Sequence, residues 1–492
     1  MSGMGVQLSQ IAQELAGVSN VLGPDAWVSD VTHDSRQIRE GSLFVAIRGA
    51  QADGHDFIDM AVEKGAAGIL VESLQDVEMP QIVVTSTRAA MPWAARVVYG
   101  SPDDSLTVVG VTGTNGKTTV VHMLESILGA ADVPVGLIGT LGARIGTHPM
   151  PTARTTPEAP DLQRMLGVMR DSGVRVVLME VSSHAIELHR SDAIHFSIVG
   201  FTNLSQDHLD FHGDMESYFA TKMRLFTSGA AERAVINIGD QWGERLHGEI
   251  LIPTTTVSVN GKADLSASDL SATSRGTSFR VASHMGTTRF ELPLVGDFNV
   301  SNALVALSMA QDLGVDMATA AKGLSTVQTI PGRMEVIAHD GPFTVIVDYA
   351  HTPDAIAVVL GSVRALSGRR VIALLGAGGD RDKEKRSIMG AAAARLSDVT
   401  IVTTDNPRTE SPTSIAEEIA RGAEAQPNTH VEVILERRSA ISHAVSIAEE
   451  GDIVVILGKG HEQGQDIGSD VLPFDDRDEA RTALLAQGWE PL

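Results

Sequence analysis

The sequence predicts an α/β protein with three domains, and three observations support this. The chain has 492 residues, which exceeds what one hydrophobic core accommodates. Apolar strand-like runs alternate with helix-like segments, and this alternation predicts mostly parallel sheets. Polar and charged residues follow several of these runs, at the carboxyl ends of strands where such sheets bind ligands. We expect domains at residues 1–102, 103–329 and 330–492.

Composition and charge narrow the class of protein. Hydrophobic residues make up 43% of the chain and charged residues 20%, which is typical of a globular protein. The net charge is 38 − 62 = −24, and it repels nucleic acids and anionic membranes. The absence of cysteines excludes disulfides, thiolate zinc sites and a cysteine nucleophile. No secretory signal or run of about 18 apolar residues is visible, so we expect a cytoplasmic protein without a membrane span.

The first block, residues 1–102, is expected to form a small α/β domain. Residues 54–64 have a helical pattern, and the polar loop 49–55 is a candidate ligand contact, although a solvated loop is the simpler interpretation. Three apolar runs predict strands: 41–47, 68–71 and 81–84.

The strongest local signal is the segment 110–119, Gly-Val-Thr-Gly-Thr-Asn-Gly-Lys-Thr-Thr. It lies between an apolar run and a helix-like stretch, so its N–H groups and the helix N-terminus would face an anion. Lys117 adds a positive charge, and the hydroxyl of Thr118 is placed to ligate Mg²⁺. The leading Gly110 stands one position earlier than the strict phosphate-loop pattern requires, and Gly113 supplies flexibility instead. We expect a phosphate site here rather than a glycine-rich surface turn.

Two more strands direct candidate metal ligands to the same sheet edge. The run 174–179 leads to Glu180, and the run 194–201 is followed by His208. Because the carboxyl ends of parallel strands meet at one edge, we expect both side chains near Thr118. This convergence favours Mg²⁺ binding over the alternative of a paired structural glutamate and a hydrogen-bonded histidine.

Two helix-like segments of the central block carry further candidates. Residues 215–226 include Lys222, which would face solvent if it had no special role. A second helix opens near residue 297, and Asn299 and Asn302 stand three apart on one face of it. These asparagines could read a base or cap the helix.

The third block, residues 330–492, is expected to be a Rossmann-like domain. The glycine-rich run 376–379 does not match a dinucleotide fingerprint, so NAD is a poor prediction. Four apolar runs predict parallel strands, and a polar segment follows each of them: 343–347, 371–375, 399–402 and 453–457.

Taken together, the motifs resemble those of the Mur ligases, the ATP-dependent amide-bond synthetases of peptidoglycan assembly. The resemblance covers essentially the whole chain, with the motifs in the family's order. It implies a ligase that uses ATP and Mg²⁺, takes only small-molecule substrates, works as a bacterial cytoplasmic monomer, and serves cell-wall biogenesis, cell shape and cell division. The matching motifs are residues 110–119, Glu180-Val181-Ser182-Ser183-His184, Gly296-x-Phe298-Asn299-x-x-Asn302, Pro331-Gly332-Arg333 and Asp348-Tyr349-Ala350-His351.

Within the family, the chain resembles the branch that adds the third residue to UDP-N-acetylmuramoyl-L-alanyl-D-glutamate. The segment Asp405-Asn406-Pro407-Arg408 resembles the signature of the meso-diaminopimelate-adding members. A guanidinium can hold the second carboxylate of diaminopimelate in a bidentate pair, whereas lysine lacks that carboxylate. Glu462 would pair with the distal ammonium. The chain has Leu188 where some relatives have a substrate-contacting glutamine, although Arg190 is retained.

The resemblance implies a role for each matched residue. Lys117, Glu180, His208 and Lys222 would be catalytic, and Lys222 would be carbamylated to N6-carboxylysine. The ATP contacts would be Gly113, Thr114, Asn115, Gly116, Lys117, Thr118, Thr119, Asn302, Arg333, Asp348 and His351. The UDP-muramoyl dipeptide would contact Ser35, Gln51, Ala52, Thr155, Thr156, Ser182 and Arg190. Diaminopimelate would contact Arg381, Asp405, Asn406, Arg408, Gly458 and Glu462. The Mg²⁺ ligands would be Thr118, Glu180, His208 and the Lys222 carbamate.

The implied reaction proceeds through an acyl phosphate on the D-glutamate γ-carboxylate, which the amine of the added amino acid attacks. Three alternatives remain open at this point. The same ligase could take L-lysine or L-ornithine. A folylpolyglutamate synthetase shares the central architecture, but its loop usually ends in Gly-Lys-Gly-Ser. A motor or switch NTPase would need a Walker-B aspartate where Glu180 stands.

Overall fold

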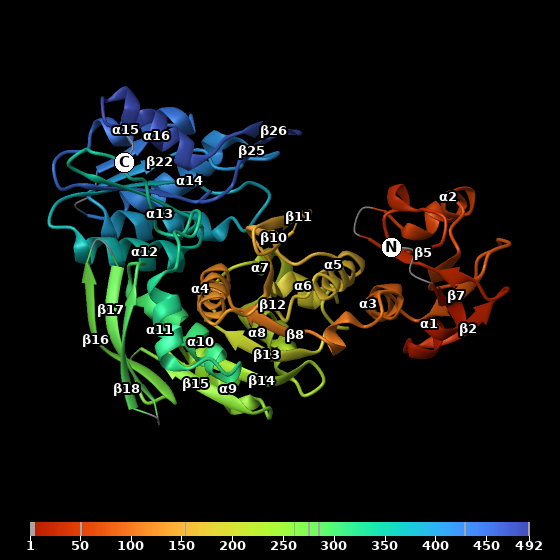
Figure 1. Cartoon of the computed structure of the whole chain (residues 1–492). Helices are drawn as coiled ribbons and strands as arrows, with labels where there is room; N and C mark the ends of the chain where they lie inside the picture. The colour runs from red at the N-terminus through yellow and green to blue at the C-terminus, as the bar shows by residue number, and fades with distance from the viewer. Residues whose placement is uncertain are drawn as a thin grey trace.

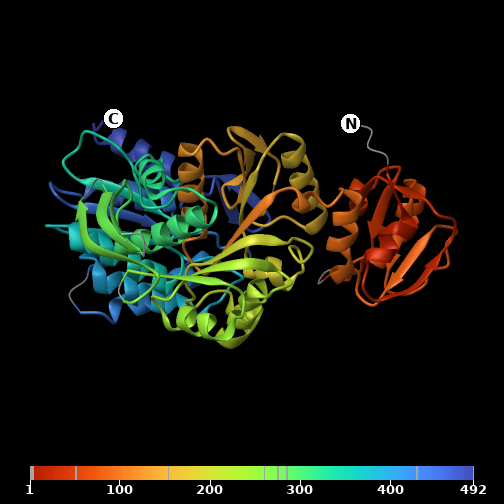
Figure 2. The ribbon, with the colours of Figure 1, turned by 60° about the horizontal axis from the view of Figure 1, so that its bottom comes forward.

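The α/β class predicted from the sequence is confirmed. The computed structural model describes residues 5–49, 52–152, 154–259, 261–273, 276–283, 286–427 and 430–490. Its three main sheets have five, eleven and six strands and follow one another along the chain. The N-terminal sheet lies at one end of the molecule in both views, and the other two lie together (Figure 1, Figure 2). None of the helices in these ranges is long and apolar enough to cross a membrane.

The N-terminal sheet has the strand order β2-β7-β6-β5-β4, with β4 to β7 parallel and β2 antiparallel to β7. Strands β5, β6 and β7 are buried along their whole length, because helices and loops cover both faces. The elements of this part are β1 (Val6–Gln7), α1 (Leu8–Glu14), β2 (Val18–Leu22), β3 (Trp27–Val28), β4 (Asp30–Thr32), β5 (Ser42–Val45), α2 (Ile58–Glu63), β6 (Gly68–Val71), β7 (Gln81–Val84) and α3 (Thr87–Val98). The helix expected over 54–64 begins with a 3-10 turn, Gly54–Phe57, which Asp53 caps.

The central sheet has eleven strands in the order β11-β10-β9-β12-β8-β13-β14-β15-β16-β17-β18. Strands β9, β12, β8, β13, β14, β15 and β16 run parallel, and antiparallel pairing begins beyond β9 at one edge and beyond β16 at the other. The strands are β8 (Thr107–Thr112), β9 (Val135–Gly139), β10 (Gly142–Ile145), β11 (His148–Met150), β12 (Val176–Glu180), β13 (Phe196–Phe201), β14 (Ala231–Asn237), β15 (Thr254–Ser258), β16 (Leu265–Thr273), β17 (Gly276–Ser283) and β18 (Gly286–Leu292).

Helices cover both faces of the central sheet, so β8 and β12 at its centre are almost wholly buried. One core contains residues of α4, α10 and α11, and the other contains residues of α5, α6 and α8. The helix expected over 215–226 ends as α8 at Met223 and continues as a 3-10 turn. The helices are α4 (Lys117–Ala130), α5 (Ala159–Asp171), α6 (Ser183–Glu187), α7 (Leu209–His212), α8 (Met215–Met223), α9 (Gln241–Glu249), α10 (Asp297–Asp312) and α11 (Met317–Ser325).

The C-terminal sheet has the order β19-β20-β24-β21-β22-β23, and only β19 is antiparallel to its neighbour. Helices α12, α13 and α14 contribute to the core on one face, and α15 and α16 to the core on the other. The elements are β19 (Glu335–Val336), β20 (Thr344–Asp348), α12 (Pro353–Leu366), β21 (Val371–Leu375), α13 (Glu384–Leu396), β22 (Val399–Val402), α14 (Pro412–Glu424), β23 (His430–Val433), α15 (Arg437–Ser446), β24 (Ile453–Leu457), β25 (Gly464–Ile467), β26 (Asp470–Pro473) and α16 (Asp476–Ala486).

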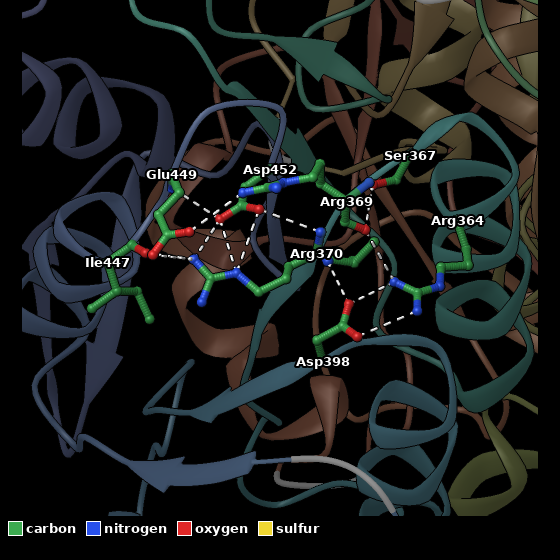
Figure 3. A network of polar contacts seen from close by, with 9 residues as sticks. Arg364, Ser367, Arg369, Arg370, Asp398, Ile447, Glu449 and Asp452 are labelled. Atoms are coloured by element: carbon green, nitrogen blue, oxygen red, sulfur yellow. Dashed lines mark hydrogen bonds and ion pairs between the residues drawn. The ribbon is translucent and has the colours of Figure 1, made fainter.

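An ion-pair network joins the amino ends of three strands in this sheet (Figure 3). Arg370, just before β21, bonds to Asp452, just before β24, with Nη2 2.7 Å from Oδ2. Asp398, just before β22, accepts from the backbone N–H of Val371 at 2.8 Å and pairs with Arg364 of α12. We call Arg364, Arg370, Asp398 and Asp452 the amino-edge network. It fixes where these strands begin.

Candidate functional site

The segment predicted to bind phosphate forms the turn between β8 and α4, residues 113–116, which we call the phosphate turn. Gly116, with φ of 86°, precedes the first residue of the helix. A Cβ at this position would come within 2.3 Å of the Asn302 side-chain oxygen, so both the backbone conformation and the space require glycine. Lys117 Nζ donates to the carbonyls of Gly113 and Thr114, each at 2.8 Å. Burial lowers the pKa of Lys117.

Glu180 lies beside this turn, as expected, because β12 pairs with β8 and places Glu180 opposite Val111. Its buried carboxylate accepts from the Thr118 hydroxyl at 2.9 Å. It also accepts from the backbone N–H and the hydroxyl of Thr140, at 2.8 and 3.0 Å. The structure therefore brings together Thr118 and Glu180, two of the four predicted Mg²⁺ ligands, as a pair of hard oxygen donors.

His208 follows β13 and caps α7 in the left-handed conformation, with φ of 54°. Its Nε2 lies 3.3 Å from Asp207 Oδ2, and its ring lies 4.7 Å from that of His184. Burial lowers the pKa of His208 to about 3, so the imidazole is neutral at pH 7. Among the described residues, no group of three or more His, Cys, Asp or Glu side chains is arranged to hold a metal ion.

Lys222 is buried, contrary to the solvent-facing position of an ordinary helical lysine. It extends from α8 to the underside of the phosphate turn, and its relative exposure is 1%. Its Nζ donates to Gly113 O at 3.1 Å and to Thr112 Oγ1 at 3.4 Å. Burial and the nearby charge of Lys117 hold the pKa of Lys222 well below its usual range. The lowered pKa makes the neutral amine, which is the nucleophilic form, more accessible than in an exposed lysine.

A cavity of about 700 Å³ opens beside the phosphate turn and extends to the C-terminal part. Its wall contains most of the residues predicted to contact ATP and the muramoyl dipeptide. The predicted site residues in its wall are Thr114, Asn115, Gly116, Lys117, Thr118, Thr119, Thr155, Thr156, Glu180, Ser182, Arg190, His208, Asn302, Arg333, Asp348, His351 and Arg381. The described site residues outside that wall are Ser35, Ala52, Gly113, Lys222, Asp405, Asn406, Arg408, Gly458 and Glu462. Gln51 lies outside the residues that the structure describes.

The C-terminal part contributes Arg333, Asp348 and His351 to this cavity. The Arg333 guanidinium lies 4.5 Å from the centre of the Tyr349 ring, and its Nη2 is 3.4 Å from Thr118 Oγ1. Asp348 accepts from the backbone N–H groups of Met334 and Ala350 at 2.7 and 2.8 Å, and its burial raises its pKa. This wall therefore carries both a cation and a carboxylate.

Thr156, Ser182 and Arg190 line the side of the cavity nearest α5 and α6. Arg190 Nη1 donates to Thr156 O at 3.2 Å, and Thr156 Oγ1 lies 3.4 Å from Ser182 Oγ. The Arg190 Nε has no hydrogen-bond partner within the described residues. Leu188, the departure from the family pattern, caps the C-terminus of α6 and is absent from the cavity wall.

Sequence reasoning gave no role to Glu158 or Asp207, although both lie within motifs. The buried Glu158 pairs with Arg88 of α3, with Arg154 and with Arg190. Asp207 has its carboxylate 3.5 Å from Lys385 Nζ and 3.7 Å from His351 Nε2. Burial would raise its pKa, but the hydrogen bond from His351 and the nearby charge of Lys385 hold that pKa well below the usual range. The sequence signal that could have identified them is their position: Glu158 follows Thr155 and Thr156, and Asp207 directly precedes His208.

The loops after β22 and β24 carry the residues predicted to bind diaminopimelate. Gly458 approaches Asp405 so closely that a Cβ would lie 2.5 Å from Asp405 Oδ2. Asn406 Nδ2 donates to Glu462 Oε2 at 2.9 Å. Arg408 takes a left-handed conformation, with φ of 51°, and its Nη1 donates to Gly379 O at 2.6 Å. Asp405, Asn406, Gly458 and Glu462 therefore form one cluster, and Arg408 reaches the loop that carries Arg381.

The fold and site define a three-part α/β protein with a phosphate turn, and comparisons with known proteins identify its family. Sequence profiles described as "Mur ligase family, catalytic domain", "Mur ligase middle domain" and "Mur ligase, glutamate ligase domain" match residues 28–100, 111–310 and 332–460. The chain belongs to the Mur ligase family, and the resemblance noted from its motifs is confirmed.

Two similar proteins and one solved structure carry the same name. A Streptomyces coelicolor protein named UDP-N-acetylmuramoyl-L-alanyl-D-glutamate--2,6-diaminopimelate ligase is 43% identical over 484 residues, covering 96% of each chain. An Aquifex aeolicus protein of the same name is 41% identical over 465 residues, covering 94% of each. A solved structure of a ligase of that name is 32% identical, with a TM-score of 0.69, and covers 99% of this chain and all of its own.

Proposed function

We propose that the protein is an ATP-dependent ligase of peptidoglycan synthesis that adds meso-diaminopimelate to UDP-N-acetylmuramoyl-L-alanyl-D-glutamate. The observation that carries this proposal is the phosphate turn with Glu180 beside it, at one end of a cavity that also contains Arg190 and Arg381. Relatives that are 41 and 43% identical over more than nine-tenths of the chain bear the name of this activity. We place the enzyme in the bacterial cytoplasm as a monomer, with domain boundaries after residues 102 and 329.

The reaction has two steps on one carboxylate. An oxygen of the D-glutamate γ-carboxylate attacks the γ-phosphorus of ATP, the bond to the β-phosphate oxygen breaks, and ADP leaves. The amine of diaminopimelate then attacks the acyl carbon and loses a proton. The carbon–oxygen bond to phosphate breaks, and its electron pair leaves with phosphate. The products are an amide, ADP and phosphate.

The residues around the cavity suit both steps. The N–H groups of the turn and Lys117 bind the β- and γ-phosphates, with Asn302, Arg333, Asp348 and His351 holding the remainder of ATP. Thr155, Thr156, Ser182 and Arg190 hold the muramoyl peptide. Ser35 and Ala52, outside the cavity wall, are proposed to bind the UDP moiety, together with Gln51, which lies outside the described residues. Because these groups bring several anions together, catalysis consists mainly of positioning and charge stabilisation.

Thr118 and Glu180 fit a magnesium site. A hydroxyl and a carboxylate 2.9 Å apart offer oxygen ligands, and phosphate oxygens and water would supply the others. Bound Mg²⁺ would neutralise the charge that develops on the transferred phosphoryl group. His208 and Lys222 are proposed to serve a second ion.

Lys222 can do this only after modification, because an ammonium offers donors and no acceptor. Its burial and lowered pKa support carbamylation: the neutral amine nitrogen attacks carbon dioxide, a C–N bond forms and one proton is lost. The carbamate would add two oxygen ligands beneath the turn. Restoration of Lys222→Ala activity by short carboxylic acids would support this assignment, and persistent inactivity in their presence would oppose it.

The identity of the added amino acid rests on Arg408, Arg381 and Glu462. Two guanidinium groups and a carboxylate match the carboxylate and ammonium at the distal end of diaminopimelate. L-Lysine and L-ornithine lack that carboxylate, so we rank them second. A folylpolyglutamate synthetase-like activity is the remaining alternative, and the names of the relatives oppose it.

The test is phosphate release from ATP in the presence of UDP-N-acetylmuramoyl-L-alanyl-D-glutamate and one amino acid at a time. We expect release with meso-diaminopimelate, and a tripeptide product of matching mass. Preference for L-lysine would overturn the role of Arg408 and leave the ligase intact. Absence of release with all three amino acids would overturn the ligase itself.

A further inference from the structure

Lys459 is a buried cation that the proposed reaction does not use. It follows Gly458 after the end of β24, and its side chain has 0% exposure. Its Nζ donates to Asn406 Oδ1 at 2.8 Å and to Glu462 Oε2 at 3.0 Å, and lies 3.9 Å from Asp405 Oδ1. An ammonium without solvent needs such partners, so its place among these three side chains is well determined.

We propose that Lys459 is a positioning residue of the amino-acid pocket, where it sets the orientation of the Asn406 amide and the Glu462 carboxylate and thereby the selectivity for a distal ammonium. This proposal rests on the proposed function. It adds a determinant that touches none of the substrates: Lys459 acts through Asn406 and Glu462.

The hydrogen bonds fix which way the Asn406 amide points. Its Oδ1 accepts from Lys459 Nζ and from the backbone N–H of Asp466, at 2.8 and 3.0 Å. A flipped amide would turn its own N–H₂ toward these two donors, which is unfavourable. The Nδ2 therefore faces Glu462, to which it donates at 2.9 Å.

The same contacts give the two carboxylate oxygens of Glu462 different roles. Oε2 accepts from both Lys459 and Asn406, whereas no hydrogen bond to Oε1 occurs within the described residues. The side chain is 31% exposed, so Oε1 can meet an incoming group. Two donors on one oxygen hold the carboxylate plane, and the second oxygen is left as the acceptor for an ammonium.

A buried ion pair holds the two loops that carry these residues. Arg437, on α15, forms two 2.7 Å bonds to Asp476 of α16. Its Nη2 also donates to Leu457 O at 2.9 Å, at the end of β24, and its Nη1 to Thr404 O at 3.4 Å. Arg437 acts on Asp405 and Glu462 only at longer range, whereas Lys459 Nζ lies 3.0 Å from Glu462 Oε2 and 3.9 Å from Asp405 Oδ1. We call Asp405, Asn406, Lys459 and Glu462 the carboxyl-edge network.

The experiment compares meso-diaminopimelate with 2-aminopimelate, which has both carboxylates but no distal amine. In the wild-type enzyme we expect diaminopimelate to have the higher kcat/KM. In Lys459→Met, the ratio of kcat/KM for diaminopimelate to kcat/KM for 2-aminopimelate should fall by about tenfold. The KM values for ATP and for the muramoyl dipeptide should stay unchanged. Glu462→Gln should lose the same preference, and the double variant should lose no more than either single variant. Lys322→Met, on the exposed face of α11, is the matched control and should keep the ratio.

The possible outcomes separate a positioning role from a structural one. A Lys459→Met enzyme that keeps the ratio, or that loses kcat/KM equally for both amino acids, would overturn the positioning role, because a merely structural lysine gives that result. If Lys459→Met does not fold, Lys459→Gln allows the same comparison, because its neutral amide can still donate to Asn406 but supplies no charge-assisted hydrogen bond to Glu462. A fall in the ratio would then support the role, and an unchanged ratio would overturn it. A wild-type enzyme that uses neither amino acid would overturn the proposed function instead.

Discussion

The amino-edge and carboxyl-edge networks lie at opposite ends of the same parallel strands, and they differ in what they leave unpaired. At the amino edge, Arg370 bonds to Asp452, and both oxygens of Asp398 bond to Arg364. At the carboxyl edge, the cation is buried, the Glu462 side chain is 31% exposed, and no hydrogen bond to its Oε1 occurs within the described residues. A network in which every charged group is paired serves stability, whereas one that leaves a carboxylate oxygen without a partner can serve binding.

The largest effect should come from Arg408, at the carboxyl edge. Arg408→Lys keeps the positive charge but loses bidentate geometry, so kcat/KM for diaminopimelate should fall by about 100-fold. The thermal unfolding temperature should barely change. Steady-state kinetics and a melting curve on the same preparation check this. An unchanged kcat/KM would show that Arg408 does not bind the amino acid.

The second-largest effect should come from Arg370, at the amino edge, and should change stability without changing the kinetics. Arg370→Ala leaves the buried Asp452 carboxylate without its guanidinium partner, which should cost about 1–3 kcal/mol in the free energy of unfolding. Urea unfolding measures the loss. Asp452→Asn in the same background should restore part of it. A raised KM for any substrate would contradict the division between the two edges.

His461, next to Glu462, should make stability depend on pH. Burial lowers its folded-state pKa from 6.5 to about 4, with Arg333 acting in the same direction. The unfolded chain therefore binds the extra proton as pH falls below 6.5, so stability is complete above pH 6.5 and decreases between pH 6.5 and 4. Urea unfolding at several pH values measures how the free energy of unfolding depends on pH. His461→Gln should reduce that slope by the equivalent of up to about one bound proton. An unchanged slope would mean that His461 titrates normally.

The smallest effect should come from Arg364, whose ion pair with Asp398 is largely solvated. Its side chain is 45% exposed, so Arg364→Ala should cost below about 1 kcal/mol and leave kinetics intact. The loss should shrink further at high salt. A loss as large as that of Arg370→Ala would show that exposure does not rank the contacts of this network.

The sequence was sufficient to predict the α/β class and the neighbours of the phosphate turn. Strand alternation and apolar runs are local signals, and parallel pairing places Glu180 beside Thr118 without further information. The pairing of side chains was not accessible in this way. Lys459 reaches Asn406 across 53 residues of chain, and Glu158 bonds to Arg88 across 70. The helical pattern around Lys222 did not reveal that this lysine is buried under the phosphate turn, and only the family resemblance assigned it to the site.

The central claim is that the phosphate turn and Glu180 activate a carboxylate as an acyl phosphate. Substrate with ¹⁸O in the D-glutamate γ-carboxylate tests it directly, because the oxygen that attacks ATP leaves with phosphate. We predict one ¹⁸O atom in each phosphate released in the presence of diaminopimelate, measured by mass spectrometry. Unlabelled phosphate alongside labelled amide product would contradict the acyl phosphate and the role given to this site.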